Sequence, residues 1–168
     1  MKQRQNGFSL IELLIVVAII LIISAIAIPN LLRSKMAANE SSAISSMRTI
    51  NTAEINYAAL YPSVGYSPDI ASLGGLPTAC SAGQATPAAA CIMDDVLAKA
   101  TTISTAKSGY YFTYGGLFIF NNVTTAYNVV ATPVSVGSTG QRSFFTDHTG
   151  VIRYEQSIAP TVASSPIQ

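Results

Sequence analysis

The chain has 168 residues, a length that fits one modest domain together with a tail or an anchor. Only 10% of the residues are charged, well below the share of about 25% in an average soluble domain. The net charge is +1 and the nine basic residues are scattered, which argues against a broad basic surface for nucleic acid.

The first element in chain order is a long apolar run. Residues 1–7 (MKQRQNG) are polar, and residues 8–28 (FSLIELLIVVAIILIISAIAI) follow with a single charge, Glu12. As a helix this run would be about 31 Å long, close to the thickness of the hydrocarbon layer of a bilayer. A plain transmembrane anchor explains that length. It does not explain Glu12, because a carboxylate in lipid costs roughly 2.5–3.5 kcal/mol and usually marks a function.

A secretory signal peptide is a second interpretation of the same run. Ala25-Ile26-Ala27 resembles the small-x-small signal for cleavage. The apolar run is long for a signal peptide, however, and an acidic residue interrupts the approach to it. Cleavage after Ala27 would also leave a helix that begins at Ile28-Pro29.

A prepilin leader is the third interpretation. The segment GFSLIELLIVVAIILIISAIAIPN, from Gly7 to Asn30, closely resembles the N-terminal motif of type IV pilins and type II secretion pseudopilins. In that family a membrane peptidase cuts after the glycine and methylates the new N-terminal residue. The resemblance therefore implies that residues 1–7 are a leader, that cleavage falls between Gly7 and Phe8, and that Phe8 is N-methylated.

The same resemblance implies a role in assembly for Glu12. Cleavage before Phe8 creates a positive amine, and Phe8 and Glu12 lie four residues apart, on one face of a helix. In the family, the glutamate is thought to pair with the N-terminal amine of a neighbouring subunit, where opposite charges in an apolar medium attract strongly. The spacing permits pairing within one chain equally well, so both arrangements remain open.

Pro29 ends the apolar segment 8–29 and predicts a kink there that would be relevant to assembly. The helix signal then continues, because residues 30–61 contain neither glycine nor proline. Apolar residues at helical spacing predict an amphipathic helix that lies under a globular head: Met36, Ala43, Met47, Ile50, Tyr57 and Tyr61. Polar residues predict the opposite, solvent-facing side: Asn39, Ser42, Ser46, Asn51 and Thr52.

Residues 62–107 are predicted to connect the helix to a sheet. The stretch 62–91 is rich in turn residues and predicts a long loop, and a short helix is expected at 93–100. Cys80 and Cys91 are the only cysteines, and an even pair in an exported chain predicts a disulfide. Such a bridge is worth on the order of 3 kcal/mol in the loop-entropy model. Two free thiols, or half of a metal site, are the alternatives.

Residues 108–156 predict a small antiparallel sheet of about four strands. Runs rich in aromatic and β-branched residues occur at 110–114, 117–120, 127–136, 142–147 and 150–155. Gly115-Gly116 predicts the turn between the first two runs, Pro133 predicts an edge position or a bulge, and residues 157–168 predict a loose tail. The expected fold is α+β, with a long N-terminal helix packed on the sheet, in agreement with the type IV pilin fold.

The function expected from the resemblance is that of a structural subunit of a type IV pilus. Its expected partners are further copies of itself or other pilins, the prepilin peptidase and methyltransferase, the inner-membrane assembly platform, and membrane lipid before assembly. The precursor would cross the bacterial inner membrane once with its N-terminus in the cytoplasm, and the assembled pilus would be extracellular. Nucleic acid is not an expected partner.

Three alternatives remain. A type II secretion pseudopilin often has a calcium site near its C-terminus, and no convincing acidic cluster occurs there. A membrane-anchored receptor for DNA uptake needs a basic stripe, and a secreted enzyme needs a group of reactive residues. The only histidine, His148, lies in a predicted turn. We therefore predict no catalytic residue, no metal and no cofactor.

Overall fold

The computed structural model describes residues 8–156 and 160–167. The chain divides into two compact units, Met1–Lys35 and Met36–Gln168. The long helix α1, Leu10–Leu60, contributes its first part to one unit and its second part to the other. The predicted helix is therefore confirmed, and Pro29 lies inside it.

The second part of α1 buries the apolar face that the spacing predicts. Ala43, Met47, Ile50 and Tyr57 are all at most 1% exposed. The predicted polar face is partly wrong, because Ser46 and Asn51 are also buried. Two charged residues that the spacing analysis left unassigned, Glu40 and Glu54, are buried on α1 as well.

Short helices occupy the segment between α1 and the sheet. They are η1 (Ala71–Leu73), α2 (Pro77–Ser81), α3 (Asp95–Ala98) and η2 (Ile103–Thr105). Helix α3 lies within the predicted range 93–100, and its first turn contains Asp95. The loop predicted at 62–91 is thus interrupted by η1 and α2, although it has no strand in the element order.

The sheet has five antiparallel strands in the order β1-β2-β3-β4-β5. They are β1 (Tyr110–Phe120), β2 (Val123–Pro133), β3 (Arg142–Asp147), β4 (Arg153–Gln156) and β5 (Ser165–Pro166). The α+β class is confirmed, with one strand more than expected. The extra strand comes from the predicted loose tail, because Ser165 pairs with Tyr154 and Pro166 with Arg153.

The turn predicted at Gly115-Gly116 is wrong. Strand β1 runs through this position, and its register against β2 shifts between Tyr114 and Gly116. A glycine within a strand commonly marks such an irregularity. The chain reverses instead at Asn121 and Asn122, whose φ angles are +49° and +64°. Asparagine tolerates this left-handed conformation better than most residues, so the pair forms a tight hairpin turn.

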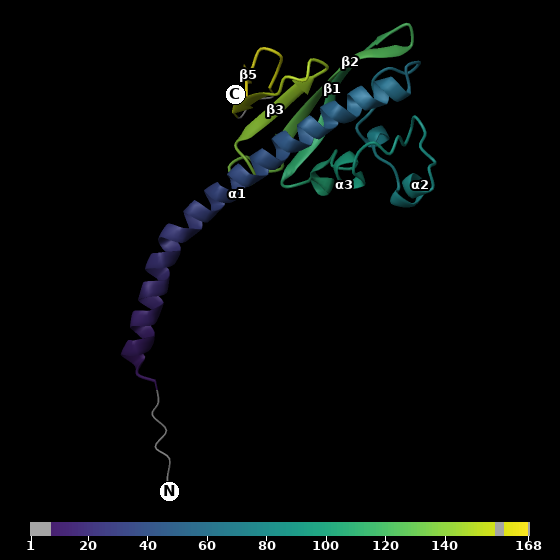
Figure 1. The fold of residues 1–168 in the computed structure, drawn as a ribbon. Coiled ribbons are helices and arrows are strands. Elements are labelled where there is room, and N and C mark those ends of the chain that lie inside the picture. Colours follow the sequence, from purple (N-terminus) through teal and green to yellow (C-terminus); the bar gives the residue numbers. More distant parts are fainter. Residues whose placement is uncertain (1–7, 157–159, 168) are drawn as a thin grey trace. The chain divides into compact units, whose positions relative to one another are not determined.

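The core of the second unit lies between α1 and the sheet (Figure 1). Figure 1 shows this part of the helix lying along one face of the sheet, with α2 and α3 on segments beside it. Large side chains from both layers are fully or almost fully buried: Met47, Ile50, Tyr57, Tyr110, Phe112, Tyr127, Val129 and Phe144. A small antiparallel sheet needs such a partner for stability, and α1 provides it.

Candidate assembly segment

The first part of α1 exposes an unusually large apolar surface. From Phe8 to Leu32 every large hydrophobic side chain is exposed, by 48% to 82% of its area. Monomeric soluble proteins rarely expose contiguous apolar patches of more than a few hundred Å². This helix is also the single one, within the described residues, that is long and apolar enough to cross a membrane. The segment therefore requires an apolar environment that its own chain does not supply.

Glu12 is the only charged residue in this exposed segment from Phe8 to Pro29. One of its carboxylate oxygens, Oε2, accepts a hydrogen bond from the backbone N–H of Ser9 over 2.9 Å. Phe8 is 82% exposed, and Gly7 lies outside the described residues. The carboxylate thus lies at the beginning of the helix, close along the chain to the predicted new amine of Phe8. The cleavage site itself stays a prediction.

Pro29 lies where the apolar segment ends. Proline has no N–H, so it cannot donate the helical hydrogen bond at its own position. One turn earlier, the carbonyl oxygen of Ile26 accepts a side-chain hydrogen bond from Asn30 Nδ2 over 3.1 Å. The role of Pro29 in assembly stays a prediction.

The second part of α1 is fixed to the head by a buried carboxylate near its start. Glu40 is 7% exposed, and its Oε1 accepts hydrogen bonds from the backbone N–H groups of Gln141 and Arg142. Its Oε2 lies 2.7 Å from a guanidinium nitrogen of Arg142. The ion pair and the two backbone bonds hold α1 against the start of β3.

A second buried carboxylate lies fourteen residues further along α1. Glu54 is fully buried and accepts hydrogen bonds from the backbone N–H and the hydroxyl of Ser67, over 2.9 and 2.7 Å. The hydroxyl of Tyr114 on β1 also donates to Glu54 Oε1. Burial raises the pKa of Glu54 above its ordinary value, and within the described part of the chain no cation pairs with it. Burial, together with the neighbouring Glu54, also raises the pKa of Tyr114.

Asn51 forms the third polar contact between α1 and the sheet. Its amide nitrogen donates to the hydroxyl of Thr146 over 2.8 Å, and its carbonyl oxygen accepts from the hydroxyl of Tyr127 over 3.1 Å. Both partners are buried, so the amide fixes how α1 lies on β2 and β3.

Comparison with known proteins finds a match over the N-terminal apolar segment and partial matches to two proteins. A family model described as "Prokaryotic N-terminal methylation motif" matches residues 2–28. Over 87 residues the chain is 34% identical to "Type IV major pilin protein PilA" of Myxococcus xanthus. Over 59 residues it is 47% identical to "Type IV wide pilus major component PilA4" of Thermus thermophilus.

Over part of its length the chain therefore resembles type IV pilins, and its N-terminal residues match the methylation motif. The two alignments cover 48% and 35% of this chain, and they span only 40% and 39% of the lengths of the two relatives. No solved structure gives a significant match.

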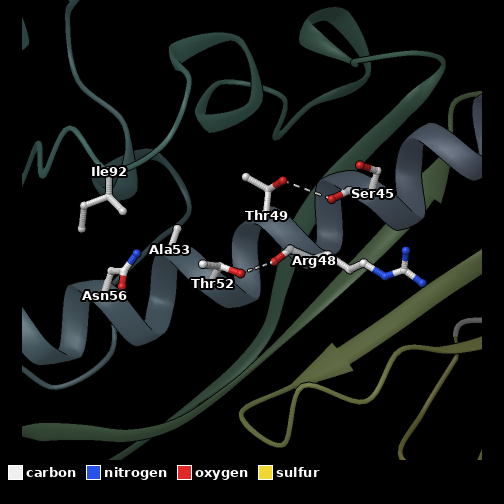
Figure 2. A pocket seen from close by; sticks show the side chains of 7 residues that line it. All are labelled: Ser45, Arg48, Thr49, Thr52, Ala53, Asn56 and Ile92. Atoms are coloured by element: carbon white, nitrogen blue, oxygen red, sulfur yellow. Dashed lines mark hydrogen bonds between the residues drawn. The ribbon is translucent and has the colours of Figure 1, made fainter.

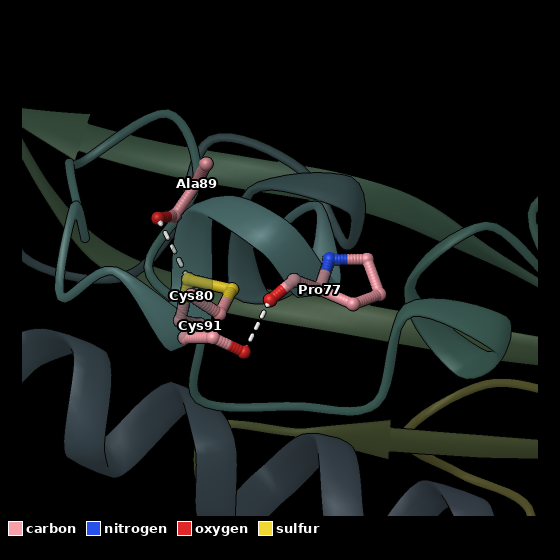
Figure 3. Close-up of a disulfide and its surroundings, with 5 residues drawn as sticks. Pro77, Cys80, Ala89 and Cys91 are labelled. Atoms are coloured by element: carbon pink, nitrogen blue, oxygen red, sulfur yellow. Dashed lines mark hydrogen bonds between the residues drawn. A yellow bond between two sulfur atoms is a disulfide. The ribbon is translucent and has the colours of Figure 1, made fainter.

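The predicted disulfide of this chain is present. Cys80, in α2, is bonded to Cys91, eleven residues later (Figure 3). A side chain at Gly75 would not fit beside it, because a Cβ there would lie 2.7 Å from both sulfur atoms. After the bridge, the backbone N–H groups of Ile92 and Met93 donate to the carbonyl oxygen of Leu73. The disulfide therefore closes a loop whose end is attached to the buried part of the head.

Sequence reasoning missed the buried polar groups of α1. Glu40 and Glu54 each lie three residues before a buried apolar position, Ala43 and Tyr57, and thus within the buried stripe. That spacing was a usable signal. The partners of the two carboxylates follow in the sequence only at 67, 114, 141 and 142, so nothing local identified them.

Proposed function

We propose that this protein is a structural subunit of a type IV pilus, polymerised through the first part of α1. The observation that carries the proposal is the exposed apolar run that begins at Phe8, with Glu12 as its only charge. Before assembly, membrane lipid covers this run. In the filament, the corresponding runs of neighbouring subunits replace the lipid, and the heads form the outer surface.

The chemistry of Glu12 supports an ordered assembly. Cleavage between Gly7 and Phe8 gives a terminal amine that stays positive after a single methylation. A new subunit that places its amine beside the Glu12 carboxylate of a neighbour neutralises both charges in an apolar medium, and other axial positions leave both unpaired. The subunit therefore has a preferred register. The prepilin peptidase and methyltransferase, and an assembly platform in the inner membrane, are the partners that this process requires.

The rival functions have less support. Both named relatives are pilus components, so a type II secretion pseudopilin is not favoured. Among the described residues no group of three or more histidine, cysteine, aspartate or glutamate side chains is arranged to hold a metal ion. We propose a mechanical role without catalysis.

The intact mass of the protein in sheared surface filaments tests the proposal. We expect a chain that begins at methylated Phe8 and contains the whole of α1. As a control, Gly7→Leu should block cleavage, keep residues 1–7 attached and trap the precursor in the membrane. A secreted, water-soluble monomer that begins near Ile28 would contradict the proposal, and so would a cleaved Gly7→Leu chain.

A further inference from the structure

The outward face of α1 in the head has depressions on both of its sides, and Arg48 lines both of them. One has a volume of about 310 Å³, and the other, beside the turn that joins β3 to β4, has about 250 Å³. The first depression is lined by Ser45, Arg48, Thr49, Thr52, Ala53, Asn56 and Ile92 (Figure 2). The second is lined by Arg48, Gly150, Val151, Ile152 and Ile167.

Arg48 is the charged group on this face, and its bonding capacity is unused. The threonine hydroxyls next to it donate to carbonyl oxygens of their own helix, Thr49 to Ser45 over 3.1 Å and Thr52 to Arg48 over 3.0 Å. Figure 2 shows the guanidinium of Arg48 extended along the helix, away from Ile92. The side chain is exposed and has neither an ion pair nor a hydrogen bond within the described part of the chain.

Other cations of the head do have partners. Arg142 pairs with Glu40 and Lys99 with Asp95, while Lys107 donates to the hydroxyl of Ser46. In a chain with only 10% charged residues, an exposed arginine among hydroxyl groups is therefore distinctive. Its five N–H donors in a planar fork match a carboxylate.

Two carboxylates of the head, Asp94 and Glu155, have no hydrogen bond or ion pair within the described residues, and Asp94 is the exposed one of the two. Asp94 precedes α3 at the N-cap position, is exposed, and makes no capping hydrogen bond. The next residue, Asp95, is by contrast held by Lys99 at 2.6 Å. Asp94 lies two residues after Ile92, which forms part of the rim of the first depression.

We propose that the face of α1 around Arg48 binds a second copy of this chain, whose Asp94 supplies the carboxylate for the guanidinium. Arg48 and Asp94 do not pair with each other in one chain, and their charges are complementary. A contact in which Arg48 of one copy meets Asp94 of the next joins two different residues, and such a contact builds an open filament when its rotation does not close a ring. Complementary charges in such a contact fix which copies fit and in which register. The inference rests on the proposed pilus function and assigns one of its contacts between heads.

Charge exchange tests this contact in cells that make the full-length chain. Arg48→Glu should reduce the yield of sheared filaments by about tenfold or more, because the contact then places two carboxylates together. The double variant Arg48→Glu with Asp94→Arg should recover most of the yield. The matched control, Arg48→Glu with Glu155→Arg, moves a positive charge to a half-buried carboxylate position on β4 and should not recover it.

The filament yields of these variants decide whether Arg48 contacts Asp94 of a second copy. Normal filaments from Arg48→Glu, no recovery with Asp94→Arg, or equal recovery with Glu155→Arg would overturn the assignment. Near-UV circular dichroism of each chain in detergent reports whether its head is folded, and the two positions of the proposed contact, Arg48 and Asp94, are both exposed. Wild-type cells without filaments of this chain would instead contradict the proposed function.

A chemical cross-link gives a second measurement that does not depend on recovery. Arg48→Lys keeps the charge and adds an amine that a carbodiimide can join to a carboxylate in contact with it, with loss of one water molecule. In filaments made from a mixture of isotopically light and heavy chains, we expect a cross-linked peptide pair that joins Lys at position 48 to Asp94 and combines both isotopes. Filaments without this mixed pair would contradict the inference.

Discussion

The two parts of α1 have the same backbone conformation and opposite surroundings. Up to Lys35 nearly every side chain is exposed, although most of them are apolar. From Met36 onward one apolar face of the helix is buried, and the buried polar side chains are bonded to the sheet or to the loop after the helix. The chain itself therefore covers the apolar face of the second part and supplies hydrogen-bond partners for its buried polar groups. The first part needs other molecules to cover its apolar surface.

The carboxylates of the two parts differ in the same way. Glu54 accepts three hydrogen bonds from within the head, and Glu40 pairs with Arg142. Glu12 accepts one bond from a backbone N–H one turn away and pairs with no cation in the described residues. Two of these carboxylates stabilise a fold, and the third remains available for a partner.

An aspartate substituted into one or the other part of α1 should have the largest effect, on folding of the head in one case and on filament formation in the other. Met47→Asp puts an unpaired carboxylate in the core, which costs about 3–5 kcal/mol and should unfold the head. Ile19→Asp lies outside the core and should leave the head folded but abolish filaments, because it adds a charge to the apolar run. Near-UV circular dichroism in detergent reports on the head, and electron microscopy on filaments. A folded head in Met47→Asp, or normal filaments of Ile19→Asp, would contradict the assigned roles of the two parts of α1.

Removal of Glu12, the single acidic group of the first part of α1, should have the next largest effect. Glu12→Ala should leave cleavage and the head unchanged and reduce filament yield by about tenfold or more, since the terminal amine then lacks its partner. Intact mass checks processing, and quantitative immunoblotting of sheared fractions checks yield. Normal piliation would refute the charge-pairing role.

The difference between the two parts of α1 could be predicted from the sequence because it depends on local patterns. The apolar run, the spacing of Met47, Ile50 and Tyr57, and the cysteine pair can all be read without tertiary information. The turn at Gly115-Gly116 could not be judged in this way. Glycine and asparagine pairs both favour turns, and the pairing of β1 with β2 selects Asn121-Asn122.

The partners of Glu40, Asn51 and Glu54 were also beyond local reasoning. Glu40 reaches partners 101 and 102 residues away, and Glu54 reaches one 60 residues away. A glutamate in an amphipathic helix is normally assigned to the solvent side, because burial without a partner costs free energy. Only the fold brings the partners together.

Glu54→Ala should destabilise the head by about 3–4 kcal/mol, since it leaves the backbone N–H of Ser67 without an acceptor and removes the carboxylate that also accepts from the hydroxyls of Ser67 and Tyr114. Glu54→Gln retains an acceptor and should cost less. Thermal unfolding of the full-length protein in detergent measures both variants, and filament yield should fall only as far as the head unfolds. Equal stability of Glu54→Ala and wild type would contradict the anchoring role.

Because Glu54 is buried, the stability of the head should depend on pH. Burial raises its pKa above 4.5, so the folded head keeps the proton to higher pH than the unfolded chain does. Its stabilising contribution is fully present below pH 4.5 and is lost as the pH rises through the folded pKa. The melting temperature of wild type relative to Glu54→Gln should therefore rise as the pH is lowered from neutral toward 4.5. A difference that is constant with pH would contradict this assignment.

Loss of the disulfide should have the smallest effect. Replacing Cys80 and Cys91 together by serine should destabilise the head by about 2–3 kcal/mol, through the entropy of the opened loop. The loop contributes few large side chains to the core, so filaments should still form. Thermal unfolding and sheared-fraction yields of the double variant provide the check, and loss of the fold would show that the loop has a larger role.

Cryo-electron microscopy of filaments sheared from cells tests the division of α1 most directly. We expect residues 8–28 of all subunits to form the filament centre, with Glu12 beside the terminal amine of a neighbour and the heads outside. Filaments in which this segment is missing from the subunits or lies on the solvent-facing surface would contradict it.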